Sequence, residues 1–266
     1  MTSGSGLAAW ERAEIERSAQ AARSSDVQKT PPSVLRRYAN PPAYTRFPLE
    51  YVYHLIGDIR GQSVLDVGCG DGCNAALLAA RGCRVYALDL SPDLLERAAR
   101  RVIEDGVRDS VHFLCGSAHA VPLPDASVDL VVGNVVLHHL DLTAASREVY
   151  RVLRPGGRAI FREPIRHSRL IRALRPLIPY RQPDLSPYER PLLKREIDAF
   201  CGPFERVRQR EFMLPFVRLA RLLGAPKALD ARLVALDGRL LASHPWLRHY
   251  ATVTVFELRK PRAAAQ

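Results

Sequence analysis

The sequence lacks the long apolar run that a membrane-spanning helix requires. No stretch of its 266 residues approaches the ~20 consecutive apolar residues of a bilayer span. Residues 1–26 carry charges where a secretory signal would need an apolar segment. We therefore expect a protein without a transmembrane segment, located in the cytoplasm.

Cysteine is scarce and follows no pattern. An odd number does not suit a disulfide framework, and the five cysteines are scattered at positions 69, 73, 83, 115 and 201. Cys69 and Cys73 are four residues apart, with no second Cys/His pair at zinc spacing. The sequence predicts a reducing compartment and no metal site. The hydrolase motif GxSxG and internal repeats are also absent.

Acidic residues are outnumbered. The chain has 39 basic and 28 acidic residues, and its net charge is +11. Such a charge attracts anionic ligands, nucleic acid or an anionic membrane surface, but identifies none of them. The length suits one domain with insertions, and 47% hydrophobic residues suffice for a large core.

The most informative segment is Leu65–Cys73, which reads LDVGCGDGC. It begins as a buried strand, and three glycines at alternate positions (68, 70 and 72) then predict a tight turn before a helix. The free N–H groups of a helix start can bind an anionic or polar ligand. The spacing is GxGxG, and Cys73 stands where the dinucleotide fingerprint has its third glycine. A nucleotide-binding loop of another type is predicted.

A second strand, 84–88, ends in Asp89, 21 residues after Gly68. A carboxylate at this place can accept hydrogen bonds from both hydroxyls of a ribose. Ser91 and Pro92 then predict a helix start, as N-cap and first helical residue.

Strands and helices alternate along the middle of the chain. We expect strands at 63–67, 84–88, 111–114, 128–132 and 158–162, and helices at 73–81, 92–104 and 142–153. This alternation predicts an α/β fold, a doubly wound Rossmann-like sheet. Residues 1–46 are expected to form a helical N-terminal cap with a helix over 7–23, 47–163 the core, and 164–200 a lid insertion. Thr30-Pro31-Pro32 and Asn40-Pro41-Pro42 are expected to break the chain before a second helix around 48–59. Residues 201–266 add two β-rich runs, 204–213 and 250–258, around a helical insertion at 214–249.

Four motifs in order resemble the class I S-adenosylmethionine-dependent methyltransferases, in particular the small-molecule branch related to quinone-biosynthesis methyltransferases. The motifs are VLDVGCGDG, VYALDLS, VPLPDASVDLVVGNVVLHHL and LRPGGRAIFREP, and the resemblance is close over residues 47–163. It implies a seven-stranded, mostly parallel sheet and S-adenosyl-L-methionine as cofactor.

The resemblance also implies residue roles. Asp89 would hold the ribose and Leu90 would pack beside the adenine. The methionine end would be wrapped by the first motif, and further contacts would follow the third and fourth strands; these residues are Asp66, Gly68, Cys69, Gly70, Gly72, Ser117, Ala118 and Asn134. The family often has an acidic residue after the third strand for the adenine amino group, and this chain has Ser117 there.

Methyl transfer is an in-line displacement for which the protein aligns the acceptor and, where needed, removes a proton. The candidate catalytic residues follow the fourth and fifth strands: His139 first, then His138 and Glu163. Paired histidines recur at this place in the resembling family, and imidazole titrates near neutral pH. Family analogy alone suggests that Tyr44, Arg46 and Phe47 close over the cofactor.

The acceptor is expected to be a small, largely apolar metabolite. A basic amphipathic helix predicted around 166–178 would also suit an anionic or lipid-like substrate. Two alternatives remain open. A nucleic-acid methyltransferase is disfavoured because Gly133-Asn134-Val135-Val136 replaces the Asn/Asp-Pro-Pro-aromatic motif after the fourth strand, and Asn40-Pro41-Pro42-Ala43-Tyr44 has an extra alanine. A non-catalytic protein that binds the cofactor as a partner subunit would keep the same glycine and Asp89 positions.

Overall fold

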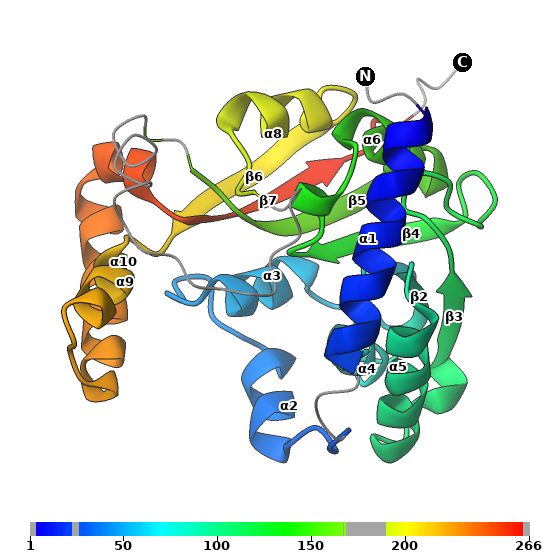
Figure 1. Cartoon of the computed structure of the whole chain (residues 1–266), viewed down its shortest axis with the longest axis horizontal. Coiled ribbons are helices and arrows are strands. Elements are labelled where there is room, and N and C mark those ends of the chain that lie inside the picture. The colour runs from blue at the N-terminus through cyan, green and yellow to red at the C-terminus, as the bar shows by residue number, and fades with distance from the viewer. Residues whose placement is uncertain (1–3, 23–26, 167, 169–189, 263–266) are drawn as a thin grey trace.

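The computed structural model describes residues 4–22, 27–166, 168 and 190–262 and contains one seven-stranded sheet (Figure 1). The strand order is β3-β2-β1-β4-β5-β7-β6. The first five strands are parallel, and β7 is antiparallel to both β5 and β6. The strands are β1 (Ser63–Val67), β2 (Arg84–Asp89), β3 (Val111–Cys115), β4 (Val128–Asn134), β5 (Leu153–Pro164), β6 (Glu205–Phe212) and β7 (Val253–Arg259). The predicted doubly wound, mostly parallel fold is confirmed.

Helices cover both faces of this sheet, and two apolar clusters fill the space between the layers. Leu65 and Val67 belong to one cluster and Val64 to the other, because successive strand residues point to opposite faces. The α-helices are α1 (Gly4–Ala22), α2 (Pro32–Ala39), α3 (Pro48–Ile56), α4 (Cys73–Ala79), α5 (Pro92–Glu104), α6 (Leu142–Val152), α8 (Lys194–Cys201), α9 (Phe216–Leu222) and α10 (Asp230–Ser243). Short 3-10 helices are η1 (Arg108–Ser110), η2 (Leu137–His139), η4 (Lys227–Leu229) and η5 (Pro245–Tyr250).

The structure differs from the sequence-based expectation at three places. Helix α2 forms between the two proline pairs, where only a break in the chain was expected. Helix α3 ends at Ile56, before Gly57 with φ +67°, although it was predicted to reach residue 59. Strand β5 starts five residues early because Leu153 pairs with Val128 ahead of an irregularity in the register. Most of the predicted basic helix, 166–178, lies outside the described residues.

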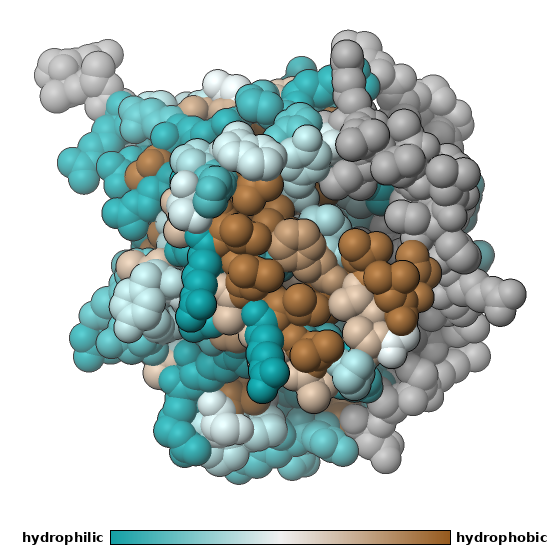
Figure 2. Space-filling view, turned by 90° about the vertical axis from the view of Figure 1, so that its left-hand side faces the viewer, coloured by the Kyte–Doolittle hydropathy of each residue, from teal (hydrophilic) through white to brown (hydrophobic). Residues whose placement is uncertain are grey.

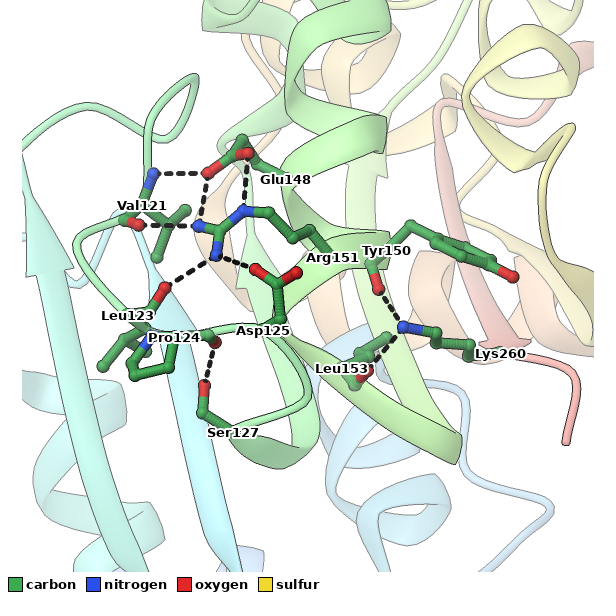
Figure 3. Close-up of polar contacts among 10 residues, drawn as sticks. All are labelled: Val121, Leu123, Pro124, Asp125, Ser127, Glu148, Tyr150, Arg151, Leu153 and Lys260. Atoms are coloured by element: carbon green, nitrogen blue, oxygen red, sulfur yellow. Dashed lines mark hydrogen bonds and ion pairs between the residues drawn. The ribbon is translucent and has the colours of Figure 1, made fainter. Parts of the chain in front are cut away.

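Arg151 of α6 fixes the long connection between β3 and β4 (Figure 3). Its guanidinium donates to the backbone oxygens of Val121 and Leu123 at 2.8 and 2.7 Å, and pairs with Glu148 and Asp125. Glu148 also accepts a hydrogen bond from the Val121 backbone N–H at 2.8 Å. Pairing with Arg151 lowers the pKa of Glu148. The connection that follows β3 is therefore held against α6 by several charge-assisted hydrogen bonds.

The side of the molecule formed by α9 and α10 carries exposed apolar side chains. Figure 2 views this side and shows apolar surface crossed by hydrophilic side chains. Helix α9 and the residue after it contribute exposed leucines, and α10 contributes one; they are Leu219, Leu222, Leu223 and Leu236. Within the described ranges, no helix has the length and apolar character needed to cross a membrane.

Candidate active site

A cavity of about 200 Å³ opens at the carboxyl ends of β1, β2 and β4, beneath helix α1. Figure 1 shows α1 lying across this part of the molecule. The cavity is lined by the first glycine loop, the ends of β2 and β4, the segment after β3, and one face of α1. This is the edge of a doubly wound sheet at which ligands bind, beside the point where the strand order reverses.

The glycine loop is shaped for close approach to a ligand. Gly68, Gly70 and Gly72 all have positive φ, at +68°, +54° and +80°. A Cβ on Gly68 would lie 2.6 Å from Val136, and one on Gly72 would lie 2.7 Å from the Cβ of Ala98 in α5. A Cβ on Gly70 would meet no atom within 4 Å, so this glycine leaves open space in the cavity. Gly72 serves the packing of α5 and does not line the cavity.

Asp89 lies at the cavity wall, at the end of β2. Its two carboxylate oxygens accept hydrogen bonds from the backbone N–H groups of Gly70 at 2.8 Å and Ser91 at 2.9 Å. Burial raises the pKa of Asp89, and these N–H groups oppose that effect. Each oxygen keeps a second lone pair, so the carboxylate can accept two further hydrogen bonds from a ligand.

Asp66 lies in β1, just before the glycine loop, and is buried. The Asn74 side-chain amide donates to its Oδ1 at 2.6 Å, whereas Oδ2 has no hydrogen-bond partner among the described residues. Burial raises the pKa of Asp66 to about 7. A buried carboxylate oxygen without a partner is costly, and Asp66 lies behind the glycine loop rather than in the lining of the cavity.

Helix α1 adds a carboxylate to the segment after β3. Glu11 Oε1 accepts a hydrogen bond from Ser117 Oγ at 2.5 Å and lies 3.0 Å from His119 Nδ1. The Asp141 backbone N–H donates to His119 Nε2, which makes Nδ1 the protonated nitrogen of the neutral ring. Glu11 therefore stands beside Ser117, where the resembling family often has its own acidic residue.

His139 and Glu14 lie beside each other at the cavity wall. His139 Nδ1 is 3.4 Å from Glu14 Oε2, and Glu14 also contacts Arg17. Burial acts to raise the pKa of Glu14, but His139 and Arg17 outweigh it and lower that pKa to about 2.

His138 and Glu163 lie behind this cavity wall. Glu163 Oε1 accepts from the backbone N–H groups of Val136 and Leu137, each at 2.8 Å, and Oε2 is 2.9 Å from His138 Nδ1. Both side chains are buried. The pair fixes the turn after β4, which includes Val135 with φ +62°, a strained conformation for a β-branched residue. This geometry favours a positioning role over the direct catalytic role expected for them.

The predicted cofactor-binding and catalytic residues fall into two groups, those at the cavity wall and those outside it. Those at the cavity wall are Gly68, Gly70, Asp89, Leu90, Ser117, Ala118 and His139. Asp66, Cys69, Gly72 and Asn134 lie outside the lining, and Asn134 accepts a hydrogen bond from Arg162. Tyr44, Arg46 and Phe47 also lie outside it, and α1 covers the cavity instead.

Sequence reasoning missed the face of α1 that closes the cavity. Its members are Trp10, Glu11, Glu14, Arg17 and Ser18. Their spacing of three and four residues places them on one face of a helix, a signal present in the sequence.

The sheet order, the glycine loop and Asp89 belong to a doubly wound, Rossmann-like α/β domain. Residues 65–161 match the family described as "Methyltransferase domain". The match covers this part of the chain, which contains the glycine loop and Asp89.

Individual relatives resemble parts of the chain. A malonyl-[acyl-carrier protein] O-methyltransferase of Serratia marcescens is 42% identical over 102 residues, which is 38% of this chain and 38% of that protein. The chain thus matches well under two thirds of the length of such curated relatives. The solved geranyl diphosphate C-methyltransferase of Streptomyces coelicolor A3(2) shares the fold with TM-score 0.59 and 15% identity, covering 94% of this chain and 98% of that one. The [4+2]-cyclase SpnF also shares it, with TM-score 0.55, 23% identity and 78% of each chain covered.

Proposed function

We propose that the protein is an S-adenosylmethionine-dependent methyltransferase acting on a small, largely apolar metabolite. The observation that carries this proposal is the cavity under α1, which joins the open glycine Gly70 to a carboxylate, Asp89, with free acceptor capacity. The family match of residues 65–161 supports it.

The residues present fit the cofactor. Asp89 would accept hydrogen bonds from the ribose hydroxyls, and Gly68 and Gly70 would allow close approach of the backbone. Asp66 and Cys69 would support the methionine end from behind the loop, Gly72 would hold α5 in place, and Asn134 would hold the end of β4 through Arg162. Leu90 and Ala118 would flank the adenine, and Glu11 beside Ser117 would accept a hydrogen bond from its amino group.

S-Adenosylmethionine, when bound, supplies an activated methyl carbon. The chain's task is then to align the acceptor, exclude water and remove a proton where the nucleophile carries one. His139 faces the cavity and would take that proton, with Glu14 stabilising the imidazolium that forms. The His138–Glu163 pair would hold the turn that carries His139.

An apolar acceptor suits the side chains around His139. Val135, Val136 and Leu140 line this end of the cavity. The related proteins include enzymes named for malonyl-acyl-carrier-protein and for geranyl diphosphate, so small metabolites with an anionic group are also compatible. We further propose a cytoplasmic, biosynthetic setting, which the absence of disulfides among the five cysteines supports.

The experiment is incubation of the intact protein with methyl-labelled S-adenosylmethionine and a panel of small apolar alcohols, amines, thiols and carboxylic acids. Label should enter at least one acceptor class, and His139→Gln should slow transfer while leaving cofactor affinity nearly unchanged. Binding of cofactor without transfer to any acceptor would contradict catalysis and favour the non-catalytic alternative. The fold alone does not decide between these outcomes, because the same fold also serves a [4+2]-cyclase, whose name describes a reaction other than methyl transfer.

A further inference from the structure

A second cavity, of about 420 Å³, lies at the end of the sheet away from α1. It is enclosed by the end of β6, by Arg46 of the N-terminal segment, by α10 and by Arg248 of η5. Figure 1 shows α1 and α10 on opposite sides of the molecule, and the two cavities share no lining residue. The proposed methyl transfer assigns nothing to it.

Helix α10 turns a mainly apolar face toward this cavity and interrupts it with a carboxylate. The face is formed by residues three and four apart, and its members are Val234, Asp237, Gly238, Leu241 and Ala242. Asp237 is only 2% exposed, and neither carboxylate oxygen has a hydrogen-bond partner among the described residues. Burial raises the pKa of Asp237 to about 6, and the nearby Leu214 backbone N–H opposes this effect without offsetting it. A carboxylate at such a position destabilises the fold, so its presence points to a ligand.

Three arginines surround the same cavity: Arg46, Arg210 and Arg248. Arg210 is held in place, because its guanidinium donates to the Ala43 backbone oxygen at 2.9 Å and lies over the rings of Tyr51 and Phe212. Arg46 and Arg248 are exposed and have no carboxylate partner in the described part of the chain. The rim therefore presents donors and positive charge, while the wall presents an acceptor.

The backbone around the cavity has one strained residue and one close approach between segments. Met213, directly after β6, has φ +60°, an unfavourable conformation for a residue with a side chain. Gly238 lets the N-terminal segment approach α10, because a Cβ there would lie 3.2 Å from Arg46 Cβ. Strained backbone and a close-approach glycine at one place are common at binding sites.

We propose that this second cavity binds a small molecule with an anionic group, a carboxylate or phosphate, and a neighbouring hydroxyl or amine. The arginines would bind the anion, and Asp237 would accept the hydrogen bond of the donor. The lining holds three arginines against two carboxylates, Asp237 and Glu211, and Glu211 already accepts a hydrogen bond from the Gln209 amide. This excess of positive charge favours an anion over a cationic ligand. The site is independent of the proposed cofactor site.

The probe for the test is sn-glycerol 3-phosphate, which carries a phosphate and hydroxyls, with inorganic phosphate as the comparison. Calorimetric titration of the intact protein without S-adenosylmethionine should show saturable binding, tighter for glycerol 3-phosphate. Arg46→Gln and Arg248→Gln should each weaken it about tenfold, since each removes a charge-assisted contact. Asp237→Leu should abolish the preference for glycerol 3-phosphate over phosphate.

The matched control is Arg232→Gln, an exposed arginine on α10 outside the cavity. It should leave affinity unchanged; an equal loss in this variant would reveal general attraction to a basic surface and overturn the proposal. Absence of saturable binding at millimolar probe, or an unchanged preference in Asp237→Leu, would also overturn it. Both arginine substitutions are at exposed positions, so they keep the test decisive if Asp237→Leu does not fold. Because no cofactor is present, failure here is distinct from failure of the methyltransferase proposal.

Discussion

The two cavities lie at the carboxyl edge of one sheet, but the buried carboxylates near them differ in the hydrogen bonds that they accept. Beneath α1, Asp89 and Glu163 each accept backbone N–H groups supplied by the turns around them. Beside α10, neither oxygen of Asp237 has a hydrogen-bond partner among the described residues, and only the Leu214 backbone N–H lies near. On the cofactor side Asp66 Oδ2 also lacks a partner, but Asp66 does not line the cavity. The comparison indicates that the carboxylates at the glycine loop and behind it are held by the fold, whereas Asp237 depends on its ligand.

The largest expected effect concerns Glu163. Glu163→Leu should lower the free energy of unfolding by about 3 kcal/mol, because it leaves two buried backbone N–H groups without their acceptor and removes the contact with His138. Chemical denaturation measures this difference. Glu205→Leu, at an exposed site on β6, is the control and should have little effect. Equal stability of the two variants would contradict the positioning role of Glu163.

Removal of Asp89 should act on affinity more than on stability. Asp89→Ala should weaken S-adenosylhomocysteine binding by about 100-fold, because the two ribose hydroxyls lose their hydrogen bonds to a charged acceptor. Calorimetric titration gives the ratio, with Asp109→Ala as an exposed control. A loss smaller than a few-fold would show that Asp89 serves only the loop.

Asp237 should behave in the opposite way, because its removal should stabilise the protein. The pKa of Asp237 is raised to about 6 from the ordinary 3.8, so the folded state favours the protonated form. The resulting destabilisation grows as pH rises from 3.8 to 6 and is complete above that range. Asp237→Asn should therefore gain roughly 2 kcal/mol at pH 8 and nothing near pH 4. Thermal unfolding at both pH values checks this, and a gain of equal size at pH 4 would refute the cause given.

The smallest effect is expected on α1. Glu11→Gln should weaken S-adenosylhomocysteine binding only a few-fold, because the amide oxygen can still accept one hydrogen bond. Glu16→Gln, exposed on the same helix, is the control. If both variants bind alike, α1 covers the cavity without contributing to recognition.

The fold and the glycine-to-Asp89 part of the site could be predicted because local signals determine them. The alternation of strands and helices can be recognised without knowledge of distant contacts. The start of α5 is likewise marked locally, by Ser91 as N-cap and Pro92 as first helical residue. The pairing of Glu11 with Ser117 and His119 could not be predicted, since it joins residues more than 100 positions apart. The different surroundings of the two histidines could not be predicted either: family analogy alone ranks His139 first, and the structure places it at the cavity wall while His138 is buried against Glu163.

The central claim is that the cavity under α1 binds S-adenosylmethionine. Its most direct test is calorimetric titration of the intact protein with S-adenosylhomocysteine, followed by NAD in the same preparation. The structure predicts saturable, micromolar binding of S-adenosylhomocysteine and none of NAD. Absence of S-adenosylhomocysteine binding, or saturable binding of NAD, would contradict it.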